Sequence, residues 1–84
     1  MKNLYEIEFY DIEENVGRGI CKPDEKYTNK KVAIQEAKSI FNGLCNDDKE
    51  SLAILVNKYD QKFDEWNCIF EINKNNFMNF RKKY

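Results

Sequence analysis

The sequence predicts an α+β domain with the element order β-β-α-β-β, an antiparallel sheet of about four strands that carries one main helix on one face. Three observations lead to this fold class. Residues 65–72 alternate between two sets of side chains, as a strand with one buried face does. Residues 52–56 are continuously apolar, and residues 28–44 place apolar side chains at helical spacing.

Residues 51–73 predict a strand hairpin around which the sheet forms. Trp66, Cys68, Phe70 and Ile72 alternate with Glu65, Asn67, Ile69 and Glu71, so the first set is expected to face the core. Residues 52–56 include β-branched side chains and predict a central strand covered on both sides, with a short buried helix as the alternative. Residues 59–64 lack the Asn-Gly or Asp-Gly of a two-residue turn, which predicts a longer loop with imprecise register.

The N-terminal third predicts two further strands. Residues 4–10 alternate so that Tyr5, Ile7 and Phe9 face inward, while Glu6 and Glu8 face outward. Val16–Cys21 is a weaker strand, because its glycines favour a bulge or bend. The proline that follows at position 23 has no backbone N–H, so we expect it to end that strand at a sheet edge.

The main helix is expected over residues 28–43, with Thr28 or Asn29 as its N-cap. One apolar stripe is formed by Ala33, Ala37, Ile40, Phe41 and Leu44. Gly43 suits the left-handed residue that often ends a helix, and residues 45–50 predict a polar connection. Near the C-terminus, the spacing of Phe77, Phe80 and Tyr84 predicts a short helix that must dock to persist.

Composition predicts one soluble cytoplasmic domain spanning residues 1–84. The 84 residues give room for a single small core, and the net charge of −1 gives no overall attraction to nucleic acid or membrane. Three widely spaced cysteines form no CxxC pair, and the acidic start of the chain does not resemble a secretory signal, so a reducing compartment is expected. The longest apolar run, residues 52–56, is far too short to span a membrane.

The residue types argue against an enzyme and against a bound cofactor or metal. The chain has no histidine, and Gly17-Arg18-Gly19 lacks the length and the following helix of a phosphate-binding loop. Cys68 is predicted to be a buried small hydrophobe, and no histidine marks Cys21 or Cys45 as an activated thiolate.

Clustered carboxylates are the one pattern that suits a metal. Glu6 and Glu8 share the outward face of a strand, and Glu71 would join them if the first and last strands were neighbours. A solvated strand face explains these carboxylates more simply. A carboxylate-metal hydrolase that depends on Glu8 is therefore only a third hypothesis.

The outward sheet face predicts a protein-interaction module. It is expected to carry an apolar patch whose area is too large to stay fully exposed to water. This patch consists of Leu4, Tyr10, Ala53, Leu55, Tyr59 and Ile69. Either the C-terminal helix or a second protein chain covers them, and that chain is another protein or a second copy of this one. The residues predicted to bind the partner are Glu6, Glu8, Tyr10, Leu55 and Tyr59. We interpret the protein as a small regulator or inhibitor of the kind that phages and mobile elements encode.

The alternative hypothesis is a nucleic-acid-associated accessory protein with a basic C-terminal tail. It would use Arg18 together with four cations near the C-terminus, where aromatic side chains are interleaved with them: Lys74, Arg81, Lys82 and Lys83. The acidic first strand opposes this hypothesis because its carboxylates repel phosphate.

Overall fold

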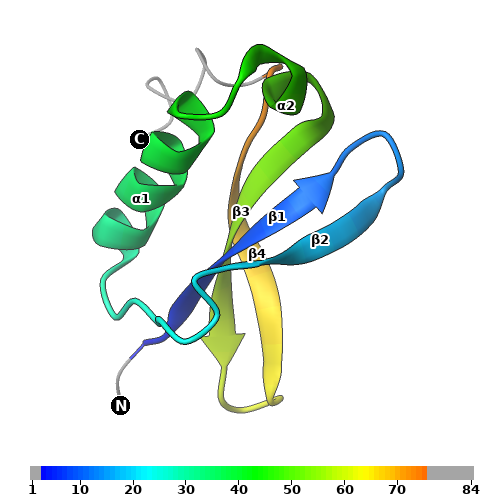
Figure 1. Ribbon diagram of the computed structural model, residues 1–84. Helices are drawn as coiled ribbons and strands as arrows, with labels where there is room; N and C mark the ends of the chain where they lie inside the picture. The colour runs from blue at the N-terminus through cyan, green and yellow to red at the C-terminus, as the bar shows by residue number, and fades with distance from the viewer. Residues whose placement is uncertain (1–2, 76–84) are drawn as a thin grey trace.

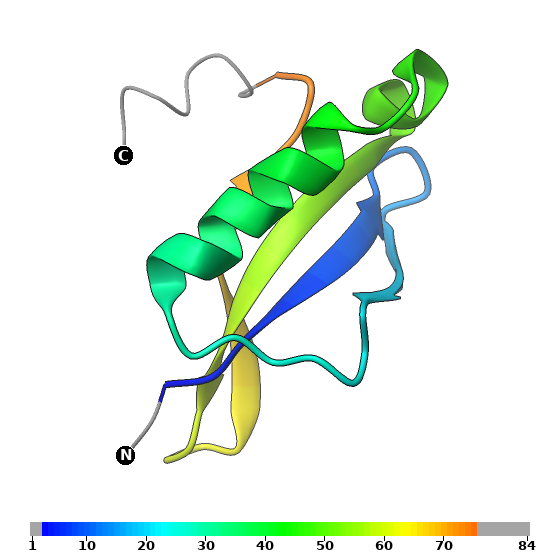
Figure 2. The same ribbon diagram turned by 60° about the vertical axis from the view of Figure 1, so that its left-hand side comes forward.

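A four-stranded antiparallel sheet carries one long helix on one face in the computed structural model, which describes residues 3–75 (Figures 1 and 2). The elements in chain order are β1 (Tyr5–Asp11), β2 (Val16–Cys21), α1 (Lys30–Asn42), α2 (Asn46–Ser51), β3 (Leu52–Asp60) and β4 (Glu65–Ile72). The predicted α+β class is confirmed. The predicted C-terminal helix around Phe77, Phe80 and Tyr84 lies outside the described residues.

The strand order is β2-β1-β3-β4. Strands β1 and β3 are therefore central, and β2 and β4 are the edge strands. Val56 of β3 pairs with Ile7 on one side and with Phe70 on the other. The continuous apolar run at residues 52–56 is therefore a strand between two others, as predicted, and not a buried helix. β2 is an edge strand that ends at Cys21, shortly before Pro23, also as predicted.

Helix α1 begins and ends where the sequence indicated, but the residue that follows it has another conformation than expected. The Asn29 side chain accepts hydrogen bonds from the backbone N–H groups of Lys31 and Val32, which caps the helix. Gly43 follows the helix with φ −84° and ψ −7°, so the prediction of a left-handed residue is wrong. Its N–H bonds back to the carbonyls of Ser39 and Ile40, and the helical turn simply continues through it.

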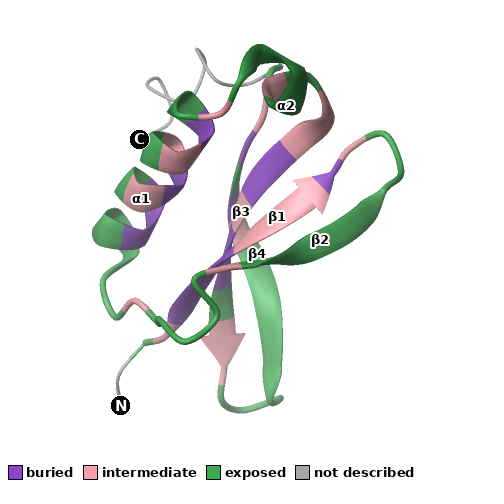
Figure 3. Ribbon diagram, in the orientation of Figure 1, coloured by how far each residue is buried: buried purple, intermediate pink, exposed green. Residues whose placement is uncertain are grey.

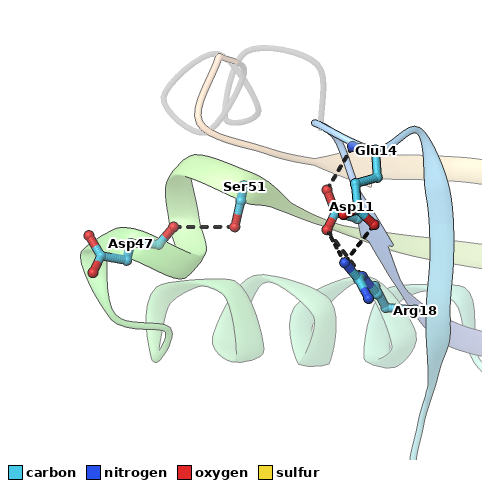
Figure 4. A network of polar contacts seen from close by, with 5 residues as sticks. All are labelled: Asp11, Glu14, Arg18, Asp47 and Ser51. Carbon is cyan, nitrogen blue, oxygen red and sulfur yellow. Dashed lines mark hydrogen bonds and ion pairs between the residues drawn. The ribbon is translucent and has the colours of Figure 1, made fainter.

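The polar connection predicted over residues 45–50 forms a short helix, α2, which we did not predict. Asp47 and Asp48 lie in the first turn of α2 and Lys49 lies in its last turn. These charges complement the helix dipole at both ends, an effect that the polar composition alone does not reveal. The Ser51 hydroxyl donates to the carbonyl of Asp47 and closes the last turn (Figure 4).

The core lies between α1 and the sheet face that it covers (Figure 3). Ala33, Ala37 and Phe41 form the buried stripe of the helix. They pack against side chains from three strands: Tyr5, Ile7, Ile54, Val56, Phe70 and Ile72. Within residues 3–75, no helix is long and apolar enough to cross a membrane.

A bulge in β4 reverses part of the predicted alternation. Val56 pairs with Phe70, but the next residue, Asn57, pairs with Cys68, so Ile69 is an extra residue in β4. Phe70 lies in the core as predicted, whereas Cys68 lies on the opposite face of the sheet. The prediction that Cys68 is buried is wrong for this reason. Ile69, predicted to face outward, instead packs against the core cluster.

The same bulge turns Trp66 away from the helix. Trp66 pairs with Tyr59, and its side chain is 36% exposed. An inward Trp66 was predicted from strict period-two alternation, which one inserted residue is enough to invert.

The turn between β1 and β2 is fixed by the carboxylate of Asp11 (Figure 4). This carboxylate accepts hydrogen bonds from the Glu14 N–H at 3.0 Å and from the Arg18 guanidinium at 2.9 Å. Both bonds lower the pKa of Asp11, and the bond from the Glu14 N–H has the larger effect. The bulge predicted from the glycines of β2 is present, because the register of β1 and β2 shifts between Phe9 and Tyr10.

Candidate protein-binding face of the sheet

We call the sheet side opposite α1 the outer face. Cross-strand partners point to the same side of a sheet, so the pairing places a defined set of residues there. This set consists of Glu6, Glu8, Tyr10, Ile20, Ala53, Leu55, Asn57, Tyr59, Trp66, Cys68 and Glu71. In the part of the chain that the structure describes, α1 covers the other face and α2 sits at the end of β3 (Figures 1 and 2).

The centre of the outer face is a row across three strands, in which Leu55 of β3 pairs with Glu8 on one side and Glu71 on the other. The Asn57 amide donates a hydrogen bond of 2.8 Å to the Glu8 carboxylate, and Asn57 is buried. On the neighbouring strand, a Cβ at Gly17 would lie only 2.6 Å from Oε2 of Glu8. Glu8 is thus held between an amide and a glycine, which gives its charge a fixed position.

Replacing Gly17 with Ala should lower the free energy of unfolding by up to about 1 kcal/mol, because the new Cβ displaces the flexible end of the Glu8 side chain and weakens its hydrogen bond from the buried Asn57 amide. Gly43→Ala is the matched control: its Cβ meets the nearest atom at 3.4 Å in a helical backbone, so it should be neutral or stabilise by up to about 1 kcal/mol. Urea unfolding of both variants measures the difference. Equal stability of the two variants would contradict the claim that Gly17 and Asn57 hold the Glu8 carboxylate in a fixed position.

An aromatic corner lies at the end of the outer face near the β3–β4 turn. The rings of Tyr59 and Trp66 are 5.2 Å apart with an interplanar angle of 51°. The Tyr59 hydroxyl donates to the carboxylate of Asp64, and this bond is the main reason why the pKa of Tyr59 is raised. The corner therefore presents two large rings, one of them held in place by the turn.

Lys26 reaches this corner from the segment between β2 and α1. Tyr27 pairs with Tyr5 through two backbone hydrogen bonds of 2.8 and 2.9 Å, which brings that segment alongside β1. The Lys26 ammonium lies 5.5 Å from the centre of the Trp66 ring and 3.4 Å from the Glu6 carboxylate. It also donates to the carbonyl of Pro23.

Cys68 lies exposed on the outer face, yet its thiol is a weak nucleophile. Desolvation of the thiol raises its pKa, and the nearby carboxylates of Glu71 and Glu8 act in the same direction. The thiol of Cys21 also has a raised pKa, mainly from burial. Both thiols are therefore protonated at neutral pH.

The five residues predicted to bind a partner, Glu6, Glu8, Tyr10, Leu55 and Tyr59, all lie on the outer face. They differ in accessibility: Glu6 is buried, while Leu55, Tyr59, Glu8 and Tyr10 are half-buried. The Tyr10 hydroxyl donates to the Asn15 side chain. Their role in binding stays a prediction.

The predicted cluster of Glu6, Glu8 and Glu71 is not formed. Glu71 would join Glu6 and Glu8 only if the first and last strands were neighbours, but β3 separates β1 from β4. Glu6 instead pairs with Lys26. Among residues 3–75, no group of three or more His, Cys, Asp or Glu residues could hold a metal ion.

Sequence reasoning missed four contributors to this face, namely Lys26, Asn57, Trp66 and Cys68. Asn57 left a signal, because it is a polar residue in a central, otherwise apolar strand. Trp66 and Cys68 were predicted on the wrong side of the sheet because strict alternation does not include the bulge. Lys26 reaches Trp66 only through tertiary contacts of a segment that is neither helix nor strand.

A hollow of about 420 Å³ lies at the turn end of the β3–β4 hairpin. Its lining combines Tyr59 and Ile69 with six polar residues: Asn3, Lys58, Asp60, Gln61, Lys62 and Asn67. The Asp60 carboxylate accepts a hydrogen bond from the Lys62 N–H. Asp60 is the one carboxylate among the residues that line this hollow, and no cysteine lines it.

The described cations of the nucleic-acid alternative are both ion-paired. Arg18 contacts Asp11 at 2.9 Å and Glu14 at 2.8 Å, and Lys74 contacts Glu50 at 2.8 Å. Arg81, Lys82 and Lys83 lie outside the described residues. Binding of nucleic acid by these five residues stays a prediction.

No protein-family model, curated protein or solved structure matches this chain. Function must therefore follow from the chemistry of the outer face. That face combines a partly exposed ring pair, a central leucine and positioned carboxylates.

Proposed function

We propose that this protein is a non-catalytic interaction module that binds another protein through the outer face of its sheet. The observation that carries the proposal is the partly exposed Tyr59–Trp66 ring pair, with Trp66 36% exposed. Large aromatic side chains contribute most strongly to binding when a partner removes them from water. Leu55 and Tyr10 extend the apolar area along β3 and β1.

The charges of the outer face favour a different protein over a second copy. A two-fold interface places the same patch of both copies face to face. Such a dimer would bring two outer faces together, each of which carries the carboxylates of Glu6 and Glu8. A homodimer is thus the weaker form of the proposal.

The setting and the biological role are part of the proposal. Cys21, Cys45 and Cys68 are all free thiols, which supports a reducing cytoplasm. A role as a small regulator or inhibitor from a phage or mobile element stays a prediction, and it would be tested by the identity of the captured partner.

The double substitution Leu55→Glu with Tyr59→Ala is expected to abolish partner capture. It adds a charge at the centre of the outer face and removes one ring of the aromatic corner. Loss of residues of this kind weakens binding by about 2 kcal/mol or more, which is roughly 30-fold. Capture from the native cell followed by mass spectrometry, with the purified variant and parent compared, measures the loss.

Val32→Glu is the control for this experiment. Val32 is 47% exposed on α1, on the other side of the molecule, so its variant should capture the same partner as the parent. Thermal unfolding of each variant checks that the fold persists. A folded double variant that captures the partner as well as the parent would refute the proposed interface.

A further inference from the structure

We infer that the outer face recognises a basic segment of its partner, with a partner arginine or lysine taking the place that Lys26 occupies between Glu6 and Trp66. This inference rests on the proposed function and adds the chemistry of the partner. A basic side chain of the chain itself already sits in the site, so the structure displays the kind of group that fits there.

The site is built around a carboxylate that is almost removed from water. The Glu6 side chain is only 9% exposed, and it meets the Lys26 ammonium on the outer face. A carboxylate with so little contact with solvent requires a cation or hydrogen-bond donors nearby. The Trp66 ring adds a second feature that attracts cations, because its face carries partial negative charge.

Lys26 occupies this site loosely. Its ammonium is 3.4 Å from the Glu6 carboxylate, longer than the roughly 2.7–2.9 Å of a strong charge-assisted hydrogen bond. It also lies 5.5 Å from the centre of the Trp66 ring, and it shares its donors with the Pro23 carbonyl. Such a contact is readily exchanged for a better one.

An arginine of a partner would satisfy the same groups more fully. A guanidinium is planar, donates two parallel hydrogen bonds to one carboxylate, and stacks on aromatic faces. Glu6 and Trp66 supply one acceptor pair and one ring for it. We therefore expect arginine to bind more tightly than lysine.

The rest of the outer face has the matching charge. Among residues 3–75, the outer face sets two carboxylates, those of Glu6 and Glu8, beside one ammonium, that of Lys26. Leu55 lies next to Glu8, so a partner segment that alternates basic and apolar residues complements this part of the face. The same carboxylates oppose both a second copy and a nucleic-acid phosphate.

The test uses Trp66, the single tryptophan of the chain, as a fluorescent reporter inside the site. The probes are three capped peptides that alternate leucine with arginine, lysine or glutamate. The arginine peptide should change the Trp66 emission saturably, the lysine peptide should bind more weakly, and the glutamate peptide should not bind. Affinity for the arginine peptide should fall as salt is raised.

Two variants locate the binding. Glu6→Gln removes the charge but keeps the shape, and should weaken the arginine peptide about tenfold or more. Lys26→Met removes the internal cation that competes for Glu6, and it should therefore strengthen binding of the arginine peptide several-fold. Glu36→Gln, which makes the same charge change on α1, should leave the affinity unchanged.

An unchanged affinity in a folded Glu6→Gln variant would overturn the inference, as would weaker binding by Lys26→Met or equal binding of the arginine and glutamate peptides. Self-association that Leu55→Glu abolishes would assign the face to a second copy and would also overturn it. These outcomes leave the proposed function intact if the double variant still loses its cellular partner. Retention of that partner would refute the proposed function itself.

Discussion

Replacing Phe70 with Ala is expected to lower the free energy of unfolding by about 3–5 kcal/mol, whereas Trp66→Ala in the same strand should cost only about 1 kcal/mol. Phe70 is 5% exposed and lies among the residues that pack beneath α1. Trp66 lies on the outer face, where its ring touches Tyr59 but leaves more than a third of its surface in water. The contrast follows from the bulge at Ile69.

Urea unfolding followed by circular dichroism measures both variants without relying on tryptophan fluorescence. Strict alternation along β4 would place both side chains in the core and would predict large losses for both. A loss for Trp66→Ala equal to or larger than that for Phe70→Ala would show that the strand does not change faces at the bulge.

Phe41→Ala should be similarly destabilising, by about 3–5 kcal/mol, because Phe41 is 1% exposed and is among the largest fully buried side chains. Small domains are typically stable by only about 5–15 kcal/mol, so this variant should be close to unfolding at physiological temperature. Calorimetry or thermal circular dichroism measures the loss.

Val32→Ala is the control for Phe41 on the same helix. Val32 is exposed, so its truncation should change stability by no more than about 0.5 kcal/mol. Comparable destabilisation by the two substitutions would contradict the packing of α1 through its Ala33, Ala37 and Phe41 stripe.

The sequence was most informative where the period of the apolar residues and the burial agree over a whole element. The stripe from Ala33 to Phe41 predicted α1 and its buried face, and the run at residues 52–56 predicted the central strand. Asn29 as the helix cap and β2 as an edge strand were also predicted from local chemistry. These features depend on neighbours in sequence.

Features that depend on one inserted residue or on a distant segment were not predictable. The extra residue Ile69 is chemically an ordinary strand residue, so nothing local marks it as the bulge that turns Trp66 and Cys68 to the outer face. Glu71 was placed beside Glu6 and Glu8 only on the condition of a strand order that the chain does not adopt. Lys26 reaches Glu6 because Tyr27 bridges Tyr5, a tertiary contact without a sequence pattern.

Part of the outer face is nevertheless predictable from the sequence. Glu6, Glu8, Tyr10, Leu55 and Tyr59 share one face because β1 and β3 pair directly and in regular register. The aromatic corner was missed since it requires the pairing of Tyr59 with Trp66 beyond the bulge. It is this corner that gives the proposed interface its exposed ring.

Alkylation of two exposed thiols gives the most direct test of the outer face as the binding surface. Cys68 lies on that face, and Cys45 lies at the start of α2, so the chain contains both the reporter and its control. The ratio of labelling rates with and without the captured partner cancels the slow intrinsic reaction of Cys68. We predict that the partner slows alkylation of Cys68 and leaves that of Cys45 unchanged; protection of Cys45 with unaltered labelling of Cys68 would contradict the account.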